Sequence, residues 1–195
     1  MKILLIFFFT QIIPGFETSS CVRNTGFGFY FVLGEKFGLC SSFKARLGEN
    51  LEGGIKPAFL FKTNGETKAG VGADAFLKFL VFKRTKDYPF NFSLIPHSAL
   101  YVEKNLFHFS FIMDFLIDYP IPLEKEFEII PYGGGGLGID FESKEIKAEN
   151  KVDVYPGIEV KIGSLFKFTK KSGIFTEIFI SSFNSALGLG VHFEI

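Results

Sequence analysis

The sequence predicts an all-β protein, an up-and-down antiparallel transmembrane β-barrel of about ten strands. Three observations lead to this fold class. Apolar and polar residues alternate over long stretches, turn-forming residues separate these stretches, and one aromatic residue is used in great excess. The chain has 195 residues with 28 Phe and no Trp, and Phe is a residue that strands favour. The length suits a single domain with a closed core.

The clearest stretch is residues 106–119, LFHFSFIMDFLIDY, whose two faces differ in character. Side chains two residues apart in a strand share a face. One face is wholly apolar, whereas the other is mixed and includes Asp114 and Asp118. The run is longer than the about 9–11 residues that a tilted strand needs to cross a bilayer. We therefore expect the apolar face to contact lipid and the mixed face to line a lumen.

The same two-faced plan recurs along the chain. The predicted strands are residues 27–34, 39–47, 51–62, 67–82, 90–103, 106–119, 127–141, 152–162, 174–180 and 185–195. The first of them carries no charge on either face, so its register stays open, and a barrel of eight strands remains an alternative. The polar segment 142–151 is expected to be a loop between two strands.

The alternation predicts two sets of side chains. The lipid-facing set is Phe107, Phe109, Phe111, Phe115, Ile158, Val160, Leu189, Val191 and Phe193. The lumen set carries both signs of charge and is Lys44, Arg46, Lys56, Asp114, Asp118, Glu128, Asp153, Glu159 and Glu177. Inward basic residues come mostly from early strands and acidic ones from later strands, so closing the sheet brings opposite charges together. Because buried charges must be paired or hydrated, a lumen filled by salt-bridged side chains is favoured over a narrow polar pore.

Residues 1–20 are expected to form a secretory signal peptide, which leaves residues 21–195 as the barrel domain. Lys2 precedes an apolar segment, and the small residues at 18–20 offer a cleavage site. Cleavage there would make Cys21 the new N-terminus, so its lipidation is left open. Cys40 is the second of the two cysteines, and a disulfide between Cys21 and Cys40 is also left open.

Composition and spacing argue against several functions. The formal net charge is zero and no basic cluster is present, so no nucleic-acid partner is expected. The cysteines lack metal-ligand spacing, and we predict no metal, cofactor or catalytic site. His108, Ser110 and Asp114 share one face, but a catalytic triad needs a convergence in space that spacing does not provide. No enzymatic activity is expected.

Five glycines lie between residues 133 and 138. No Lys-Ser or Lys-Thr pair follows them, so they do not form a phosphate-binding loop. Glycine within a strand marks a bend or a close approach, and we expect these glycines to make room for bulky lumen neighbours such as Tyr101 and Tyr155.

The segment that contains these glycines, residues 129–141 (IIPYGGGGLGIDF), resembles the Pro-Tyr-x-Gly-x-Gly-x-Gly strand of small bacterial outer-membrane barrels of the OmpA/OmpX-like superfamily. The last strands resemble theirs in residues 157–160, 175–177 and 189–193. The resemblance implies a barrel in the outer membrane of a Gram-negative-type bacterium, in contact with its lipids. It also implies that the barrel-assembly machinery recognises the C-terminal strand, although Ile195 stands where family members end in Phe.

The function that the sequence favours is therefore an outer-membrane barrel with a structural or surface-interaction role, a charged lumen and a monomeric state. A soluble lipocalin-like barrel that carries apolar ligands would instead turn the Phe-rich face inward. The lipocalin Gly-x-Trp signature is impossible in a chain without Trp. A narrow pore and a barrel enzyme that acts on lipid are also compatible with the strand pattern.

Overall fold

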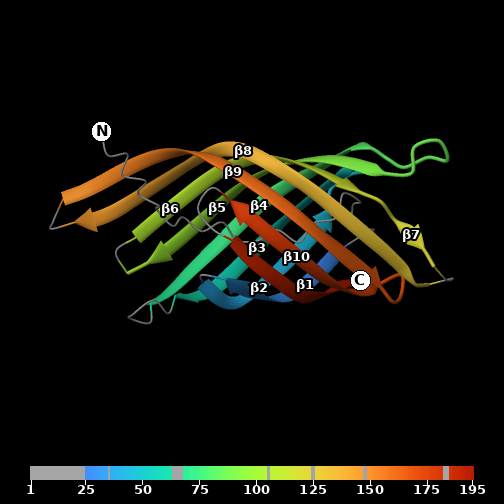
Figure 1. The fold of residues 1–195 in the computed structure, drawn as a ribbon, viewed down its shortest axis with the longest axis horizontal. Helices are drawn as coiled ribbons and strands as arrows, with labels where there is room; N and C mark the ends of the chain where they lie inside the picture. The colour runs from blue at the N-terminus through green and yellow to red at the C-terminus, as the bar shows by residue number, and fades with distance from the viewer. Residues whose placement is uncertain are drawn as a thin grey trace, which may run out of the picture.

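The fold is a closed antiparallel β-barrel (Figure 1). The computed structural model describes residues 25–34, 36–62, 68–104, 106–123, 126–146, 149–181 and 185–195, with the backbone alone at 144–146 and 149–151. The described residues form eleven strands in one sheet. Ten of these strands complete the ring, because β1 pairs with β11 and β6 pairs with β8. The prediction of ten strands is confirmed, and the signal peptide and Cys21 lie outside the described residues.

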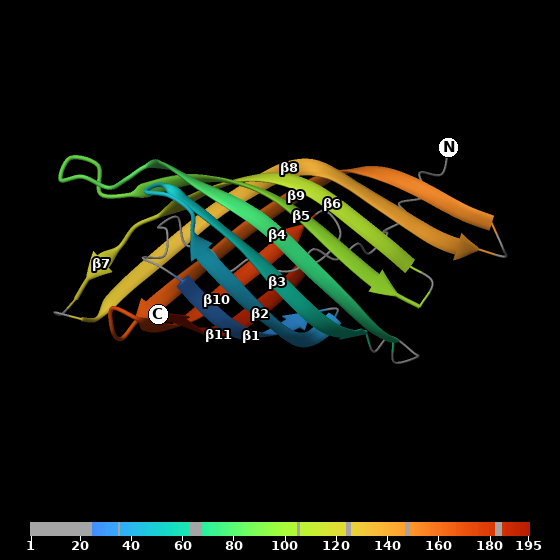
Figure 2. The same ribbon diagram turned by 180° about the vertical axis from the view of Figure 1, so that it is seen from behind.

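The strands follow one another around the barrel in chain order, each antiparallel to the next. Their bounds are β1 Thr25–Gly34, β2 Lys36–Arg46, β3 Leu51–Lys62, β4 Lys68–Phe82, β5 Asn91–Glu103, β6 Leu106–Asp118, β7 Ile121–Pro122, β8 Glu128–Ile146, β9 Glu149–Lys167, β10 Ser172–Ser181 and β11 Ser185–Glu194. The two-residue β7 pairs with β8 alone and takes no part in closure. The strands of the near and far walls cross one another in both views, so the strands are tilted relative to the barrel axis (Figures 1 and 2).

The start of β1 and the end of the chain meet at the same end of the barrel. The Ile195 N–H donates a hydrogen bond to the Thr25 carbonyl at 2.9 Å. We call this the terminal end. The described residues include no helix of the length and hydropathy that a membrane span requires.

The expected loop at 142–151 is instead the tip of a long hairpin. The β8 and β9 strands are 19 residues each, and their register continues from Glu142↔Asp153 to Ile146↔Glu149. The loop prediction was wrong because polar residues can continue a ladder wherever the adjacent strand supplies the backbone partners. The hairpin therefore extends the β8–β9 wall (Figure 1).

Side chains alternate between the outside and the interior as the period of two predicts. On β6, Phe107 and Phe111 are 46% and 49% exposed, whereas Ile112 and Leu116 are fully buried. The open register of β1 is settled, because Tyr30 and Val32 point inward while the Phe residues at 29 and 31 point outward. The Phe-rich face is the outer surface, which contradicts the lipocalin-like barrel.

The interior also contains apolar side chains. A buried cluster joins strands from around the ring and contains Tyr30, Val32, Cys40, Ala58, Leu60, Tyr101, Ile130, Leu165, Phe175 and Ala186. Three of its members, Val32, Leu60 and Tyr30, are at most 1% exposed. A barrel of this size leaves an interior that side chains can fill.

Candidate functional site: the charged centre of the lumen

Charged side chains from six strands meet inside the barrel. This central cluster consists of Lys56 on β3, Asp74 on β4, His97 on β5, Asp114 on β6, Glu159 and Lys161 on β9, and Glu177 on β10. Each of these side chains belongs to a residue that is at most 5% exposed. The cluster is assembled by the alternation, since every member occupies an inward position of its strand.

Two lysines hold carboxylates in the central cluster. The Lys161 ammonium donates a hydrogen bond to Asp114 Oδ2 and lies 2.7 Å from Glu159 Oε1. The Lys56 ammonium donates to Asp74 Oδ2 at 3.1 Å. A buried ion pair of this kind is costly to break, because removing one partner leaves the other charge uncompensated.

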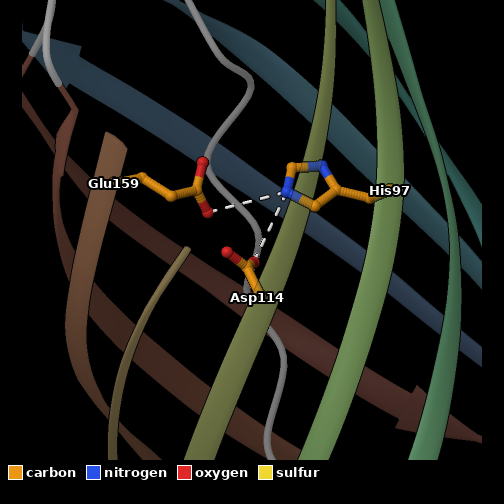
Figure 3. Close-up of side chains that lie close together, drawn as sticks. All are labelled: His97, Asp114 and Glu159. Carbon is orange, nitrogen blue, oxygen red and sulfur yellow. Dashed lines mark ion pairs between the residues drawn. The ribbon is translucent and has the colours of Figure 1, made fainter. Parts of the chain in front are cut away.

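His97 lies between carboxylates on both sides of its ring. Its Nδ1 is 3.3 Å from Asp74 Oδ1, while its Nε2 is 3.4 Å from Asp114 Oδ2 and 3.6 Å from Glu159 Oε1. Figure 3 shows Asp114 and Glu159 converging on the same ring nitrogen. The imidazole therefore connects the β4 side of the cluster to the β9 side.

Carboxylates outnumber ammonium groups in the central cluster. Glu177 accepts a hydrogen bond from the Tyr132 hydroxyl at 3.0 Å. Its second oxygen, one oxygen of Asp114 and Glu159 Oε2 have no hydrogen-bond partner in the described part of the chain. Two lysines thus face four carboxylates, and the acidic side of the cluster has unused hydrogen-bonding capacity.

The glycines of β8 allow the cluster to form. Gly134, Gly136 and Gly138 lie opposite Leu116, Asp114 and Ile112 of β6. A Cβ atom at Gly136 would overlap the Asp114 carboxylate. Because β8 separates β6 from β9 in the sheet, the lack of inward side chains at these three glycines lets Lys161 reach Asp114 across it.

These glycines make room for inward side chains of the neighbouring strand, as predicted. The side chains predicted to fill that room, Tyr101 and Tyr155, were the wrong ones. Tyr101 lies over Gly70 of β4, and Tyr155 lies opposite Asp140 rather than opposite a glycine. The alternation gave the face of each tyrosine, whereas its neighbour depends on the pairing between strands.

Six of the nine predicted lumen residues are deeply buried. Lys56, Asp114, Glu159 and Glu177 belong to the central cluster, and Lys44 is buried elsewhere in the lumen at 5% exposure. The sixth, Asp118, lies outside the cluster and accepts a hydrogen bond from the Asn91 amide at 2.6 Å.

The remaining three predicted lumen residues lie near the ends of the barrel. Arg46 is the last residue of β2 and is exposed, and its guanidinium donates to the carbonyls of Gly48 and Glu49 at 2.9 and 3.1 Å. Arg46 keeps the inward position of the alternation, opposite Glu52, but its exposed side chain lies at the rim rather than deep in the lumen. Glu128 is partly exposed and pairs with Arg84 at 3.7 Å, and Asp153 is half-buried near the hairpin tip.

Asp74, His97 and Lys161 complete the central cluster. The alternation of their strands places all three on the inner face, but it does not reveal that they meet. Further buried pairs join Lys78 to Glu52 at 2.7 Å and His108 to Asp140 at 3.2 Å.

The predicted lipid-facing residues all lie on the outer surface. Seven of them are between 43% and 49% exposed: Phe107, Phe111, Phe115, Ile158, Val160, Leu189 and Phe193. Phe109 and Val191 point outward as well and are half-buried. Phe109 owes its burial in part to the ring of Phe141, whose centroid is 6.1 Å away.

The Ser/His/Asp set on β6 does not form a triad. His108 Nε2 interacts with Asp140 Oδ1 of the neighbouring strand, not with Asp114. The Ser110 hydroxyl has no hydrogen-bond partner among the described residues. All three side chains are buried, so the set offers no nucleophile to a substrate at the surface.

No family model matches the chain, and no curated protein matches it. Among solved structures, the chain is similar to a bacterial polysaccharide outer membrane secretin, with a TM-score of 0.51 and 9% identity over 84% of this chain and 57% of that one. It is also similar to a KdgM porin, with a TM-score of 0.43 and 10% identity over 87% and 99% of the two chains. The N-terminal β-barrel domain of Pseudomonas aeruginosa OprF gives a TM-score of 0.41 and 11% identity over 87% and 95%. At these identities the likeness concerns the fold, which is that of outer-membrane β-barrels.

Proposed function

We propose that this protein is embedded in the outer membrane of a Gram-negative-type cell as a closed barrel with a structural or surface-interaction role. The observation that carries the proposal is the chemistry of the outer surface. Among the outward strand residues whose side chains are described, none is Asp, Glu, Lys, Arg or His. A charged side chain on the lipid face costs about 2–4 kcal/mol at the bilayer midplane, whereas a barrel surrounded by water has no such constraint.

Aromatic pairs at both ends of the outer surface support the membrane location. Near the terminal end, the ring centroids of Phe127 and Phe168 are 5.7 Å apart. Toward the opposite end, those of Phe37 and Phe61 are 5.3 Å apart. Membrane barrels carry aromatic girdles at the two lipid–water interfaces, and Phe takes this place in a chain without Trp.

The lumen is proposed to be closed to solutes. The central cluster links β6 to β9 through Lys161 and Asp114 and links β5 to both through His97. Fully buried Leu116 and Phe179 add apolar bulk inside the barrel. A passage would require these contacts to break, so the protein is proposed to be a plugged barrel without transport or catalytic activity.

The proposal also covers how the barrel is assembled in the membrane and its oligomeric state. The outward residues of β11 alternate as Leu187, Leu189, Val191 and Phe193, in the pattern by which the assembly machinery recognises a C-terminal strand in the OmpA/OmpX-like barrels that this chain resembles. The barrel closes on itself through β1 and β11, which supports insertion as a monomer into outer-membrane lipid.

The experiment that tests the proposal combines refolding with conductance. Protein refolded in detergent should give strong β circular dichroism and migrate differently in unheated and boiled samples on SDS gels. Reconstituted in a planar bilayer, it should show no conductance steps. A β protein that stays soluble without detergent would overturn the membrane location, whereas steady conductance would overturn the closed lumen alone.

A further inference from the structure

We infer that the centre of the lumen binds one divalent transition-metal ion, held by His97, Asp114 and Glu159. Their donor atoms come from β5, β6 and β9 and all lie within 4.8 Å of one another. His97 Nε2 is 3.4 Å from Asp114 Oδ2 and 3.6 Å from Glu159 Oε1 (Figure 3). In a tetrahedral zinc site with bonds of about 2.0–2.1 Å, neighbouring donor atoms are about 3.3 Å apart. Two edges of such a site are therefore nearly in place.

Asp74 orients His97 for this role. Its Oδ1 lies 3.3 Å from His97 Nδ1, and its other oxygen is held by Lys56 at 3.1 Å. Metal-binding histidines commonly donate their second ring N–H to a carboxylate, which fixes the tautomer. With the proton on Nδ1, the Nε2 lone pair faces Asp114 and Glu159 and is oriented to bind a cation that the two carboxylates hold.

The charges and unused oxygens of the central cluster also point to a bound cation. Asp114, Glu159 and Glu177 each have at least one oxygen without a hydrogen-bond partner in the described part of the chain, and each residue is at most 2% exposed. Polar atoms this deeply buried are normally satisfied. A cation bound between Asp114 and Glu159 would give these buried oxygens a partner.

Lys161 is the competitor of the metal ion. Its ammonium contacts the same oxygens of Asp114 and Glu159 that the ion would use. Glu177 is the inward residue diagonal to Lys161 on the neighbouring strand β10, and one of its oxygens has no hydrogen-bond partner in the described part of the chain. Binding would thus move Lys161 from Asp114 and Glu159 toward Glu177. The affinity should rise when Lys161 is replaced by an uncharged residue of similar length.

The donor set selects the class of ion. An imidazole nitrogen with two carboxylate oxygens suits Zn²⁺ and its first-row neighbours, whereas Mg²⁺ and Ca²⁺ prefer oxygen ligands alone. Three protein ligands leave a fourth position of a tetrahedral site for water.

The test refolds the full chain in chelator-buffered solutions of increasing free Zn²⁺, so that the ion can enter before the lumen closes, and uses Co²⁺ as a spectroscopic probe. Wild type should bind one Zn²⁺ per barrel, and Co²⁺ should give the strong visible bands of a four-coordinate site. Lys161→Met should bind Zn²⁺ at least about tenfold more tightly, because a competing charge is removed. Asp74→Asn should weaken binding by about 10–100-fold.

Asp118→Asn is the matched control, since Asp118 is a buried lumen carboxylate outside the central cluster, and its affinity should equal that of wild type. The inference is overturned if neither wild type nor Lys161→Met binds Zn²⁺ saturably, or if Glu159→Gln binds as tightly as wild type. Heat-modifiable migration reports whether each variant folds. Should Glu159→Gln fail to fold, the Co²⁺ spectrum of wild type decides, because six-coordinate bands contradict the site.

Discussion

The carboxylate of Asp114 occupies the space in which a side chain at residue 136 would begin. Asp114 and Gly136 are direct partners on β6 and β8, and the ideal Cβ position of Gly136 overlaps the carboxylate. The glycine on one strand is therefore a condition for the ion pair that reaches past it to Lys161 on the next.

Gly136→Ala should destabilise the barrel by about 1–3 kcal/mol, because an inserted methyl group in a filled interior forces side chains to shift. Gly133→Ala is the matched control on the same strand. The nearest atoms to its Cβ position are 3.7 and 4.0 Å away, so it should cost less. Urea unfolding in lipid vesicles, followed by circular dichroism, measures both. Equal losses would mean that Asp114 moves aside freely.

Lys78→Met should cost about 3–5 kcal/mol, because it leaves the buried Glu52 carboxylate without its ammonium partner at 2.7 Å. Lys68→Met, at the exposed start of the same strand, should change the free energy of unfolding by less than about 0.5 kcal/mol. The same unfolding assay compares the two variants. A small effect of Lys78→Met would indicate that water replaces the ammonium, and hence that the lumen is wetter than the contacts imply.

Phe111→Arg should destabilise the membrane-inserted barrel by about 2–4 kcal/mol, because Phe111 points outward from the middle part of β6. Val152→Arg tests the dependence on depth, since Val152 is 61% exposed near the β8–β9 hairpin tip. There the cost should fall to about 0–1 kcal/mol. If both substitutions cost the same in vesicles, the outer surface has no buried midplane and the proposed membrane location fails.

Cys40 offers a test of the closed lumen that uses a native side chain. It is 2% exposed and belongs to the apolar cluster inside the barrel. In a Cys21→Ser background, a charged methanethiosulfonate should label Cys40 only after unfolding. The control is Ser185→Cys with Cys40→Ser, because residue 185 is exposed at the start of β11. Rapid labelling of Cys40 in the folded barrel would show a water-filled passage.

The alternation in the sequence was sufficient to assign the faces of most strands. Period two is a local property, so Phe111 and Asp114 could be placed on opposite faces without knowledge of the partner strands. The strand number followed from the same pattern. The 142–151 segment was misassigned, because its polar residues hide a ladder that depends only on backbone pairing.

The contacts of the central cluster could not be predicted in this way. Lys161 meets Asp114 across β8 because of the register between three strands and the tilt that closes the barrel. His97 is an inward residue by alternation, but its place between Asp74 and Glu159 depends on the same closure. The depth of Arg46 was mispredicted for a local reason, because its side chain lies at a strand end and binds carbonyls of the adjacent turn.

Because β1 pairs with β11, the barrel closes late in folding and in one cooperative step. These strands are almost the whole chain apart in sequence, so closing the ring carries the largest loop-closure entropy of any pairing in the molecule. Contacts this distant in sequence slow folding. Until β11 arrives, the open sheet has two unpaired edges, each a template for association with another chain. The final strand is therefore what converts an aggregation-prone sheet into an inserted barrel.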